Sequence, residues 1–451
     1  MQQKHHYSRG AAATWLLFVA SVIGVLLIVM LLTDIFEKKQ EARYSYIKTQ
    51  EIAWGEPDPE KWKANFPREY TAYMKTMKTS ELAAVSPYSR YGGSESISKL
   101  DKNPRMKRLF AGYGFGVDYN EERGHMNAMQ DMLAIKRLGD KKPGSCMTCK
   151  SPQVPLFIEE HGAEAFYNTP VTELVEKHDF KHSISCGDCH NSETMELLVR
   201  RPAYIEAQTR RGIDINQHDQ NQKRTDACAQ CHVEYYWPKE TNYVTFPWDK
   251  GLSVDSIEAY YDAIDFADWV HAETGTRLVK IQHPEFELWS SGIHSRSGVG
   301  CADCHMPYTR DGSIKITDHW IRSPYLNMTN ACLTCHRESE DEMAQRIREI
   351  QDRTWSLMDR SETAIIEAID AIVLAIQAGA TDAELEECRK LHRKAHIRWD
   401  FVSAENSMGF HSPQEATRML GDAIDYARQA ELSATKLLSK YGKLEVAALT
   451  K

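Results

Sequence analysis

Cys186-Gly-Asp-Cys189-His190 is one of five short motifs that decide the fold of this chain. In each motif two cysteines enclose two residues, and a basic residue follows at once. Two thiols at this spacing form thioethers to one porphyrin, while the next side chain reaches its iron. The sequence therefore predicts five covalently bound haem c groups. In chain order the other motifs are the first, Cys146-Met-Thr-Cys149-Lys150, the third, Cys228-Ala-Gln-Cys231-His232, the fourth, Cys301-Ala-Asp-Cys304-His305, and the fifth, Cys332-Leu-Thr-Cys335-His336.

Paired cysteines also occur in zinc sites and in dithiol redox sites. Histidine makes up 18 of 451 residues, so its presence after four of five pairs has a chance on the order of one in 10⁵. Zinc does not need an adjacent histidine, and the pattern therefore favours haem. Of the 11 cysteines only Cys388 lies outside the motifs. It falls in a helical pattern, where we expect a buried, inert thiol.

The composition sets further limits. The net charge of −9, from 55 basic and 64 acidic residues, argues against a nucleic-acid partner. A chain of 451 residues need not form several domains here, because five porphyrins can serve as core filling.

Residues 1–36 hold an apolar run whose 23 positions from Ala11 to Thr33 carry no charge. Such a run is long enough to cross a bilayer as a helix. A cleaved signal segment usually has a shorter apolar core and small residues at the cut, whereas Asp34-Ile-Phe-Glu follows here. We favour a retained membrane anchor over a signal segment. In either case the bulk of the chain is expected in the periplasm, where bacteria attach haem c.

The chain beyond this segment divides into two predicted regions. Residues 37–337 carry the motifs among Gly, Pro and Asn, with few periodic segments, and cannot bury themselves without cofactors. Residues 338–451 are rich in Ala, Glu, Leu and Ile at helical spacing. The expected fold class is therefore mainly α, a multihaem cytochrome c with much irregular structure around five haems and a long-helix C-terminal region.

Local signals place three helices in the C-terminal region, at about 340–378, 382–402 and 413–441. Four isoleucines, at positions 365, 369, 372 and 376, share one face of the first helix, which Gly379 ends. Thr381 to Glu384 and Ser412 to Glu415 have the capping-box pattern, and Gly442 is expected to end the last helix. We expect these helices to pack on the haem core and to form a dimer interface, although a purely intramolecular role is nearly as well supported.

The ligands of the irons decide the chemistry. Iron with two protein ligands transfers electrons, whereas iron with one open position can transform a substrate. Besides the four motif histidines the non-helical segments contain enough histidines to cap four haems and leave one over. Lys150 marks the odd haem, and its amine can bind iron only when deprotonated. The additional histidines are His125, His283, His294, His319 and His411.

From about residue 50 to 440 the sequence resembles the ammonia-forming cytochrome c nitrite reductases, pentahaem periplasmic enzymes whose active-site haem is bound by lysine. The motif order carries the resemblance together with several shorter segments. These are Arg123-Gly-His125, Arg137-Leu-Gly139, Cys231-His-Val-Glu234-Tyr235-Tyr236, Lys280-Ile-Gln282-His283-Pro, Gly292-Ile-His294, Thr317-Asp-His319, Arg398-Trp-Asp and His411-Ser-Pro.

The resemblance implies a role for each candidate residue. Arg137, Tyr235 and His283 would lie above the Lys150 haem, where Arg137 holds the anion and His283 donates protons near neutral pH. Only eight residues separate Arg137 from Cys146, so the adjacent Lys136 competes for this role. The second ligands would be His319 for the second-motif haem, His125 for the third, His411 for the fourth and His294 for the fifth.

A calcium ion near the active haem is also implied. The side chains of Glu234 and Gln282 would bind it with the backbone carbonyls of Tyr235 and Lys280, an all-oxygen set that suits calcium. Bound there, the ion would orient Tyr235 and His283.

The implied reaction is the six-electron reduction of nitrite to ammonium. The electrons would come from a quinol-oxidising multihaem membrane cytochrome or a small soluble multihaem protein, and the enzyme would be a homodimer. Two alternatives stay open. One is a reductase that acts mainly on hydroxylamine, nitric oxide or sulfite, and the other is a multihaem electron carrier without catalysis, in which all five irons have two protein ligands.

Overall fold

The computed structural model describes residues 6–41, 48–77, 96–139 and 142–441, and the chain divides into two units. One unit comprises Met1–Glu51 and Ala64–Phe66 and contains helix α1 (His6–Glu41). The other comprises Ile52–Lys63 and Pro67–Lys451. The five cysteine motifs and the long C-terminal helices therefore share the second unit.

Helix α1 contains the predicted apolar segment. Its stretch Ala12–Phe36 has a mean hydropathy of 3.0, and none of it is buried within the structure. By length and composition this stretch can cross a membrane. The same properties suit a signal segment, so the helix agrees with both interpretations of residues 1–36.

The motif region consists of short helices joined by irregular chain, as predicted. Among its described residues the longest helices have 10 residues, because glycine and proline interrupt the sequence. Gly162, for example, ends α7 with a φ of +87°, which favours a residue without Cβ. The α-helices are α2 (Pro67–Met74), α4 (Lys99–Lys102), α5 (Arg105–Leu109), α6 (Ala128–Ala134), α7 (Gln153–His161), α8 (Ala163–Asn168), α9 (Val171–Lys177), α10 (Cys186–Cys189), α11 (Pro202–Arg210), α12 (Gln220–Ala229), α13 (Val254–Ala263), α14 (Glu285–Ser290), α15 (Ile293–Arg296), α16 (Cys301–His305) and α17 (Met328–Ala331).

Shorter elements complete this region. The 3-10 helices are η1 (Pro59–Lys61), η2 (Lys75–Met77), η3 (Gly114–Gly116), η4 (His125–Asn127), η5 (Gly144–Met147), η6 (Ile215–Gln217) and η7 (Pro324–Asn327). Two small antiparallel sheets, which the sequence did not predict, pair β1 (Trp269–Val270) with β2 (Arg277–Leu278) and β3 (Tyr308–Asp311) with β4 (Ile314–Thr317). Strands this short leave no clear alternation in the sequence.

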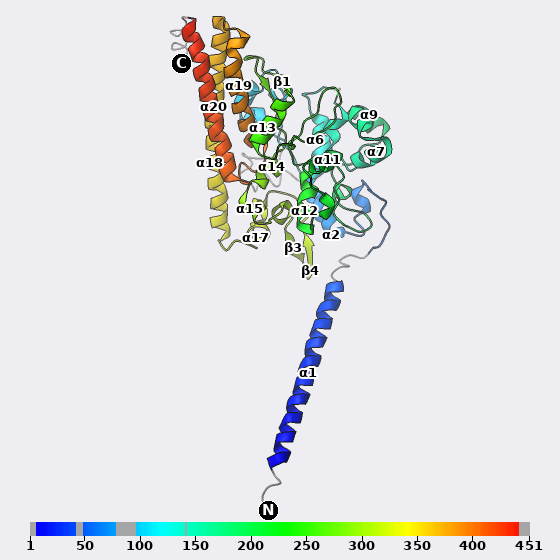
Figure 1. Ribbon diagram of the computed structural model, residues 1–451. Helices are drawn as coiled ribbons and strands as arrows, with labels where there is room; N and C mark the ends of the chain where they lie inside the picture. Colours follow the sequence, from blue (N-terminus) through cyan, green and yellow to red (C-terminus); the bar gives the residue numbers. More distant parts are fainter. Residues whose placement is uncertain (1–5, 42–47, 78–95, 140–141, 442–451) are drawn as a thin grey trace, which may run out of the picture. The chain divides into compact units, whose positions relative to one another are not determined.

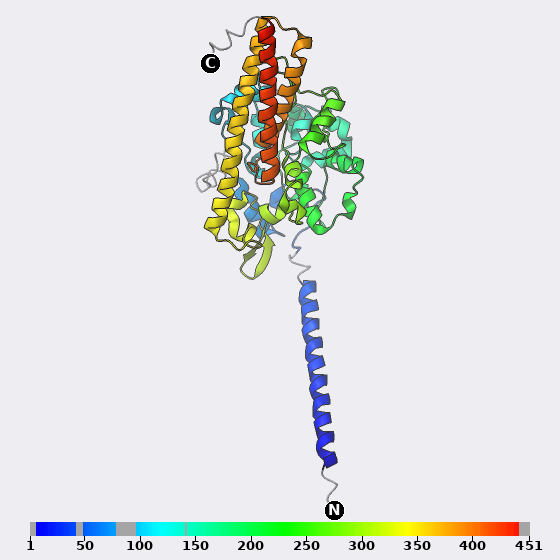
Figure 2. The same ribbon diagram turned by 60° about the vertical axis from the view of Figure 1, so that its left-hand side comes forward.

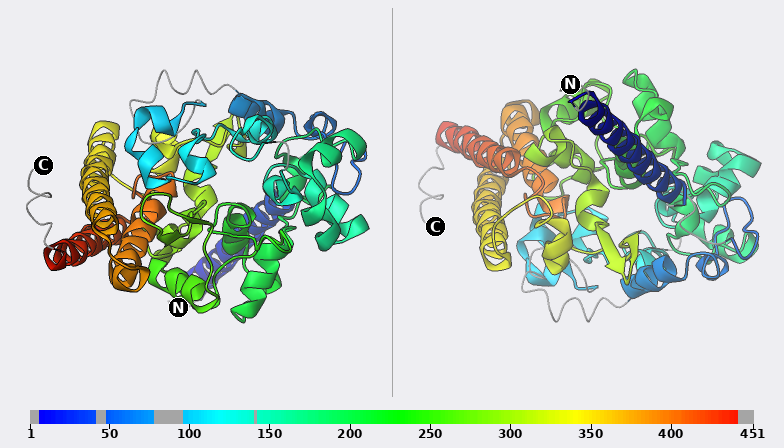
Figure 3. Two further views of the ribbon diagram at one scale, coloured as in Figure 1. Left: turned by 90° about the horizontal axis from the view of Figure 1, so that it is seen from above. Right: turned by 90° about the horizontal axis from the view of Figure 1, so that it is seen from below.

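Three long helices follow, α18 (Glu340–Ala378), α19 (Asp382–Ala404) and α20 (Pro413–Lys440). They lie side by side in Figures 1 and 2, and each packs against the other two. Seen along the bundle in Figure 3, they stand on one side of the motif region. The predicted ranges are therefore confirmed, with α19 two residues longer than expected.

Apolar stripes explain this bundle. Ile365, Ile369 and Ile372 are fully buried, and Ile376 packs against the same interior. Helix α20 buries a row of alanines with Met419 and Leu420, and small side chains let the helices approach closely. Cys388 is fully buried on α19, as expected.

The helix ends confirm one predicted cap and correct another. The N–H of Thr381 donates to the Glu384 carboxylate at 2.8 Å, and Gly379 has a φ of +103°. At the start of α20, Pro413 occupies the first turn, but the Ser412 side chain makes no cap hydrogen bond. The Glu415 carboxylate accepts hydrogen bonds from Arg418 instead, at 2.6 and 3.0 Å. The other predicted terminator, Gly442, lies outside the described residues.

Three apolar clusters form the interior. One lies entirely in the motif region and includes Met147, Phe166 and Trp248. A second lies entirely in the long helices around Ile372 and Cys388. The third joins the regions by packing α18, α19 and α20 onto Phe110, Tyr261 and their neighbours. The long helices thus have a core of their own and a second core that they share with the motif region.

Candidate haem-binding and catalytic site

The first motif differs from the others in backbone as well as in sequence. In the second, third and fifth motifs the histidine N–H donates to the carbonyl of the first cysteine, at 2.9 to 3.0 Å. This turn brings both thiols and the histidine to one side of the chain. In the first motif the Lys150 N–H donates instead to the Met147 carbonyl at 2.9 Å, after the 3-10 turn η5. The backbone turn that ends at Lys150 is therefore tighter than the turns that end at the motif histidines.

Each motif histidine faces a second histidine from a distant part of the chain. The centres of the two rings are 6.2 Å apart for His190 and His319, 6.2 Å for His232 and His125, 6.2 Å for His305 and His411, and 6.3 Å for His336 and His294. A metal held between two imidazoles at about 2 Å from each nitrogen would separate the ring centres by roughly 6.3 Å. The structure thus brings together the four pairs that the resemblance implied, at a spacing that fits an iron between them.

Hydrogen bonds at the far side of the rings fit the same role. Nδ1 of His190, His305 and His319 lies 3.1, 3.2 and 2.8 Å from the backbone oxygens of Met195, Arg322 and Thr317. Nδ1 of His411 makes an ion-pair contact of 2.5 Å with the Glu405 carboxylate instead. Such bonds fix the ring orientation and leave Nε2 for a metal.

Interactions between cysteines of different motifs show which motifs lie next to each other. The thiol of Cys149 interacts with that of Cys231, and the thiol of Cys228 interacts with that of Cys301. Cys304 interacts electrostatically with Cys332, and Cys189 with Cys228. The first, third, fourth and fifth motifs are therefore neighbours in series, and the second motif lies beside the third.

The three predicted distal residues approach the first motif. Arg137 interacts electrostatically with Tyr235 and Cys146, and Tyr235 with both cysteines of the motif. His283 interacts electrostatically with Lys150. The Arg137 guanidinium lies 4.1 Å from the centre of the Phe115 ring and donates to the Asp118 carbonyl at 3.4 Å. The adjacent Lys136 is exposed, so the structure turns Arg137, and not Lys136, toward these groups.

Two glutamates near His283, the buried Glu285 and the partly exposed Glu122, were missed by the sequence interpretation. Oε1 of Glu285 lies 4.0 Å from Nδ1 of His283. Burial, reinforced by Glu405, raises the pKa of Glu285 to about 8, while burial lowers the pKa of His283 to about 3. Glu122 interacts with both Lys150 and His283; burial acts to raise its pKa, but the charge of Lys99 lowers it to about 2. At neutral pH these shifts leave His283 as a neutral ring and Glu285 as a protonated carboxyl group.

The four residues predicted to bind calcium lie together. The fully buried Glu234 carboxylate accepts hydrogen bonds from the Gln282 N–H at 2.5 Å and from the Tyr261 hydroxyl at 2.7 Å. The Gln282 side chain donates to the Lys280 carbonyl at 3.3 Å. The Lys280 ammonium is held by Asp400, at 2.9 and 3.1 Å. Both hydrogen-bond donors to Glu234 are thus uncharged, and burial raises its pKa well above the usual range.

This donor set suits a hard cation. Within the described ranges no three His, Cys, Asp or Glu side chains gather as a metal site, so an ion here depends on the backbone and amide oxygens as well. Carbonyl, amide and carboxylate oxygens are the ligands that calcium prefers. A cation would also compensate the buried Glu234 carboxylate.

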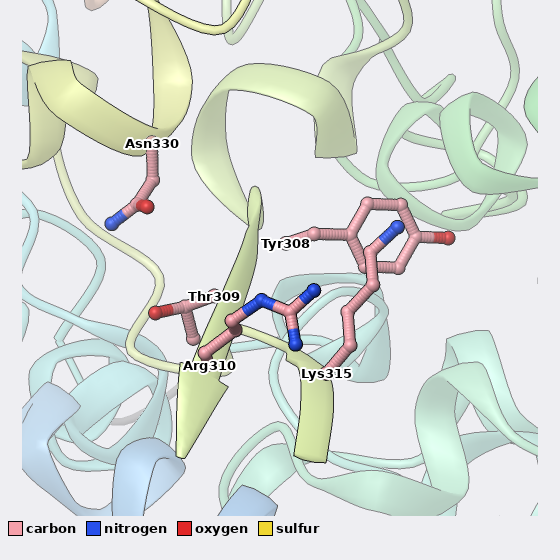
Figure 4. A pocket seen from close by; sticks show the side chains of 5 residues that line it. All are labelled: Tyr308, Thr309, Arg310, Lys315 and Asn330. Carbon is pink, nitrogen blue, oxygen red and sulfur yellow. The ribbon is translucent and has the colours of Figure 1, made fainter. Parts of the chain in front are cut away.

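A separate pocket of about 430 Å³ lies on the β3–β4 hairpin and is lined by Tyr308, Thr309, Arg310, Lys315 and Asn330. Figure 4 shows the Lys315 side chain beside the Tyr308 ring, whose centre is 4.0 Å from Nζ. None of its lining residues belongs to the predicted catalytic, haem or calcium sets.

The cytochrome c552 family model matches residues 58–450. Cytochrome c-552 of Porphyromonas gingivalis is 38% identical over 437 residues, which cover 95% of this chain and 86% of that protein. Cytochrome c-552 of Parabacteroides distasonis is 39% identical over 436 residues, covering 95% of this chain and 87% of that protein.

A solved structure shows the same fold. The cytochrome c nitrite reductase of Desulfovibrio desulfuricans, described with two calcium sites in its catalytic subunit, matches with a TM-score of 0.80 and 33% identity. The match covers 86% of this chain and 88% of that one. The resemblance to cytochrome c nitrite reductases expected from the sequence is thus confirmed, and so is the mainly α fold. The chain belongs to the cytochrome c552 family.

Proposed function

We propose that this protein reduces nitrite to ammonium at a haem attached to Cys146 and Cys149 and bound by Lys150. Four further haems, each held between two histidines, would carry electrons to it. The observation that carries the proposal is the contrast among the five motifs. Four place a second histidine with its ring centre 6.2 to 6.3 Å from that of the motif histidine, whereas the lysine motif lies beside an arginine, a tyrosine and a histidine.

The similarity to a cytochrome c nitrite reductase, at 33% identity and a TM-score of 0.80, supports this activity. The reaction consumes six electrons and eight protons for each nitrite and releases ammonium and two waters. When bound, the haem would supply the electrons and an open iron position. The side chains of this chain must then hold an anion and deliver protons repeatedly without moving.

Arg137 suits the first task. Its guanidinium is always protonated, and its stacking on Phe115 and its bond to the Asp118 carbonyl hold it in place. A fixed cation in a partly buried site attracts nitrite and stabilises negative charge on a departing oxygen. The Tyr235 hydroxyl, whose pKa burial raises well above its usual range, stays protonated and can donate a hydrogen bond to the substrate.

Proton delivery would use Glu285 and His283 in sequence. The neutral His283 ring donates from one nitrogen toward the substrate and regains a proton at the other, where Glu285 lies 4.0 Å away. Glu285 holds a proton at neutral pH because its pKa is raised to about 8. A general acid of this kind typically contributes about 10²- to 10⁴-fold to a rate.

A calcium ion bound by Glu234, Gln282 and the carbonyls of Tyr235 and Lys280 would fix the segments that carry Tyr235 and His283. The Desulfovibrio enzyme's two calcium sites support this proposal, as does the buried Glu234 carboxylate. Metal analysis of the purified protein tests it: we expect calcium in the wild type and its loss in Glu234→Gln.

The cellular setting follows from the same proposal. Helix α1 would anchor the protein to the cytoplasmic membrane with the haems in the periplasm, where a quinol-oxidising multihaem membrane cytochrome or a soluble multihaem protein donates electrons. The long helices would form the interface of a homodimer, for which the exposed Leu432 on α20 offers an apolar contact. Sedimentation of the purified protein measures the dimer.

One experiment tests the activity. We expect a high-spin ferric signal that shifts when nitrite is added, and stoichiometric ammonium when the protein is supplied with a reduced dye. A purely low-spin spectrum that nitrite leaves unchanged would contradict the proposal and favour an electron carrier in which His283 completes the ligand set of the Lys150 haem.

A further inference from the structure

Arg201 joins the first motif to the second. This arginine precedes α11 and is only 1% exposed. Its Nε donates to the Thr148 carbonyl at 2.6 Å, its Nη2 donates to the Ser151 carbonyl at 3.1 Å, and the same Nη2 pairs with the Asp188 carboxylate. Thr148 and Ser151 bracket Lys150, and Asp188 lies between the two cysteines of the second motif.

The third motif is tied to the same point. Gln230, which lies between Cys228 and Cys231, accepts hydrogen bonds from the N–H groups of Arg200 and Arg201 at 3.0 and 3.3 Å. Its amide donates to the Asp188 carbonyl at 3.3 Å. The segment at Arg201 is therefore a junction of three cofactor-attachment motifs, and all of its contacts are buried.

The charge of Arg201 also lies beside the cofactor linkages. The guanidinium interacts electrostatically with Cys149 and Cys231, the second cysteines of the first and third motifs. Its Nη1 is buried and has no hydrogen-bond partner among the described residues. Buried donors normally have a hydrogen-bond acceptor. Once haem is attached to Cys149 and Cys231, the thioether sulfurs and the haems themselves would be the nearest acceptors for this nitrogen.

We propose that Arg201 is a positioning residue that fixes the Lys150 turn beneath its haem and raises the reduction potential of that haem. The inference rests on the proposed function, because it takes Lys150 as the iron ligand. A lysine side chain has a flexible four-carbon stem, so the amine reaches the iron reproducibly only if the backbone at its base is held. Arg201 holds that backbone on both sides of Lys150, and its planar fork serves several acceptors at once.

A second arginine provides a matched control. Nη1 of Arg224 pairs with the Asp303 carboxylate, which occupies the same place in the fourth motif as Asp188 in the second. Arg224 lies just before the third motif and also has a buried nitrogen without a partner among the described residues. It pairs with an aspartate of the fourth motif as Arg201 does with one of the second, but the hydrogen bonds to Thr148 and Ser151 around Lys150 belong to Arg201.

The test compares Arg201→Lys, Arg201→Gln and Arg224→Gln with the wild-type holoprotein. Mass spectrometry first counts the attached haems. Ferric spectra then report the spin state of the Lys150 haem, a nitrite titration of the ferric protein gives its affinity, and a redox titration gives the potential of the nitrite-sensitive haem.

We expect both Arg201 variants to alter the high-spin signal and to weaken nitrite binding at least tenfold, because neither substitute reproduces the fork. Only Arg201→Gln should also lower the potential, since it alone removes the positive charge, and a lost cation favours the oxidised state. Arg224→Gln should leave the nitrite-sensitive haem unchanged. A wild-type signal and affinity in Arg201→Lys would overturn the positioning role, and an unchanged potential in Arg201→Gln would overturn the tuning role.

Failure of the proposed function remains distinguishable, because it would show in the wild type as the absence of any nitrite-sensitive haem. If the Arg201 variants lose haem during maturation, Asp188→Asn gives the decisive measurement. It removes the carboxylate partner and leaves Arg201 in place, so the signal of the Lys150 haem should shift. An unchanged signal in Asp188→Asn would overturn the inference.

Discussion

The motif region and the three long helices use the same residue types for opposite purposes. Each motif histidine faces a second histidine ring whose centre is 6.2 to 6.3 Å away. In the long helices the ring centres of His392 and His396 are also 6.3 Å apart. Both rings are fully buried, but His392 is bonded to the Thr276 hydroxyl at 3.0 Å, and Nε2 of His396 lies 3.2 Å from the Leu109 carbonyl oxygen. The groups that contact each ring, and not the depth of its burial, therefore distinguish a histidine that can bind a cofactor from one that packs in the core.

The same contrast explains what holds each region together. Helices of 10 residues or fewer are marginal alone, and the described residues of the motif region form no longer ones. The long helices have up to 39 residues and an apolar core of their own. We infer that the motif region depends on its cofactors for stability, whereas the long helices depend on ordinary side-chain packing.

The largest expected effect tests this dependence with cysteines from the two regions. Replacing Cys301 and Cys304 by Ser removes one attachment site from the middle of the motif series, so we expect the motif region to lose its protection against proteases. Cys388→Ser should cost only about 1 to 2 kcal/mol, because this buried thiol's hydrogen-bond contact is to the neighbouring Leu385 carbonyl. Limited proteolysis with peptide mapping distinguishes the two results. A protease-resistant motif region in the double variant would contradict the dependence on haem.

The next prediction concerns adjacent cations in the motif region. Arg137→Gln should lower the nitrite reduction rate about 10²-fold, because a fixed charge at the substrate is lost. Lys136→Gln should leave the rate within about twofold, since Lys136 is exposed. Steady-state ammonium formation measures both. Equal losses in the two variants would show that general charge, and not a positioned guanidinium, attracts the anion.

Only part of this fold and site could be predicted from a single sequence. The motifs, the isoleucine stripe and the Thr381 cap are local patterns, and one chain suffices to interpret them. The histidine pairs came from the family resemblance, because nothing in the spacing of His125 and His232 links them. Arg201, Asp188 and Gln230 were missed because their contacts join residues 13 to 53 positions apart, and a single sequence has no signal for such pairs. The Ser412 cap was wrong because Arg418 binds the glutamate that the pattern assigned to it.

A smaller effect is expected from two buried glutamates, one in each region. Glu285 in the motif region has a pKa raised by burial to about 8. It is therefore protonated at neutral pH and loses its proton as the pH rises through about 8. If it relays protons to His283, Glu285→Gln should lower the rate about tenfold and remove the loss of activity near pH 8.

Glu362 on α18 is the matched control. It is 1% exposed, accepts hydrogen bonds from Asn103 at 2.8 Å and from Trp399 at 3.0 Å, and burial raises its pKa as well. Glu362→Gln should leave the pH profile of nitrite reduction unchanged, because the contacts of Glu362 are structural. A profile shifted equally by both variants would show that buried charge acts through stability and not through proton transfer.

The smallest expected effect is the acid sensitivity of the long helices. Burial lowers the pKa of His392 to about 3, against 6.5 for an ordinary histidine. The contribution of this residue to stability is therefore complete above pH 6.5, and it declines as the pH falls toward 3, because only the unfolded chain takes up the proton. At pH 6 the loss is about 0.8 kcal/mol.

His392→Asn keeps a nitrogen near the Thr276 hydroxyl but cannot titrate. Hydrogen exchange of α19, corrected for intrinsic rates, should show a smaller loss of protection between pH 8 and pH 6 in this variant. The four histidine pairs proposed to bind haem should give no such difference, because a ring bound to iron does not take up a proton in this range. An equal acid response in the wild type and in His392→Asn would mean that the buried ring is protonated in the folded state, and the distinction between the two kinds of histidine would then fail.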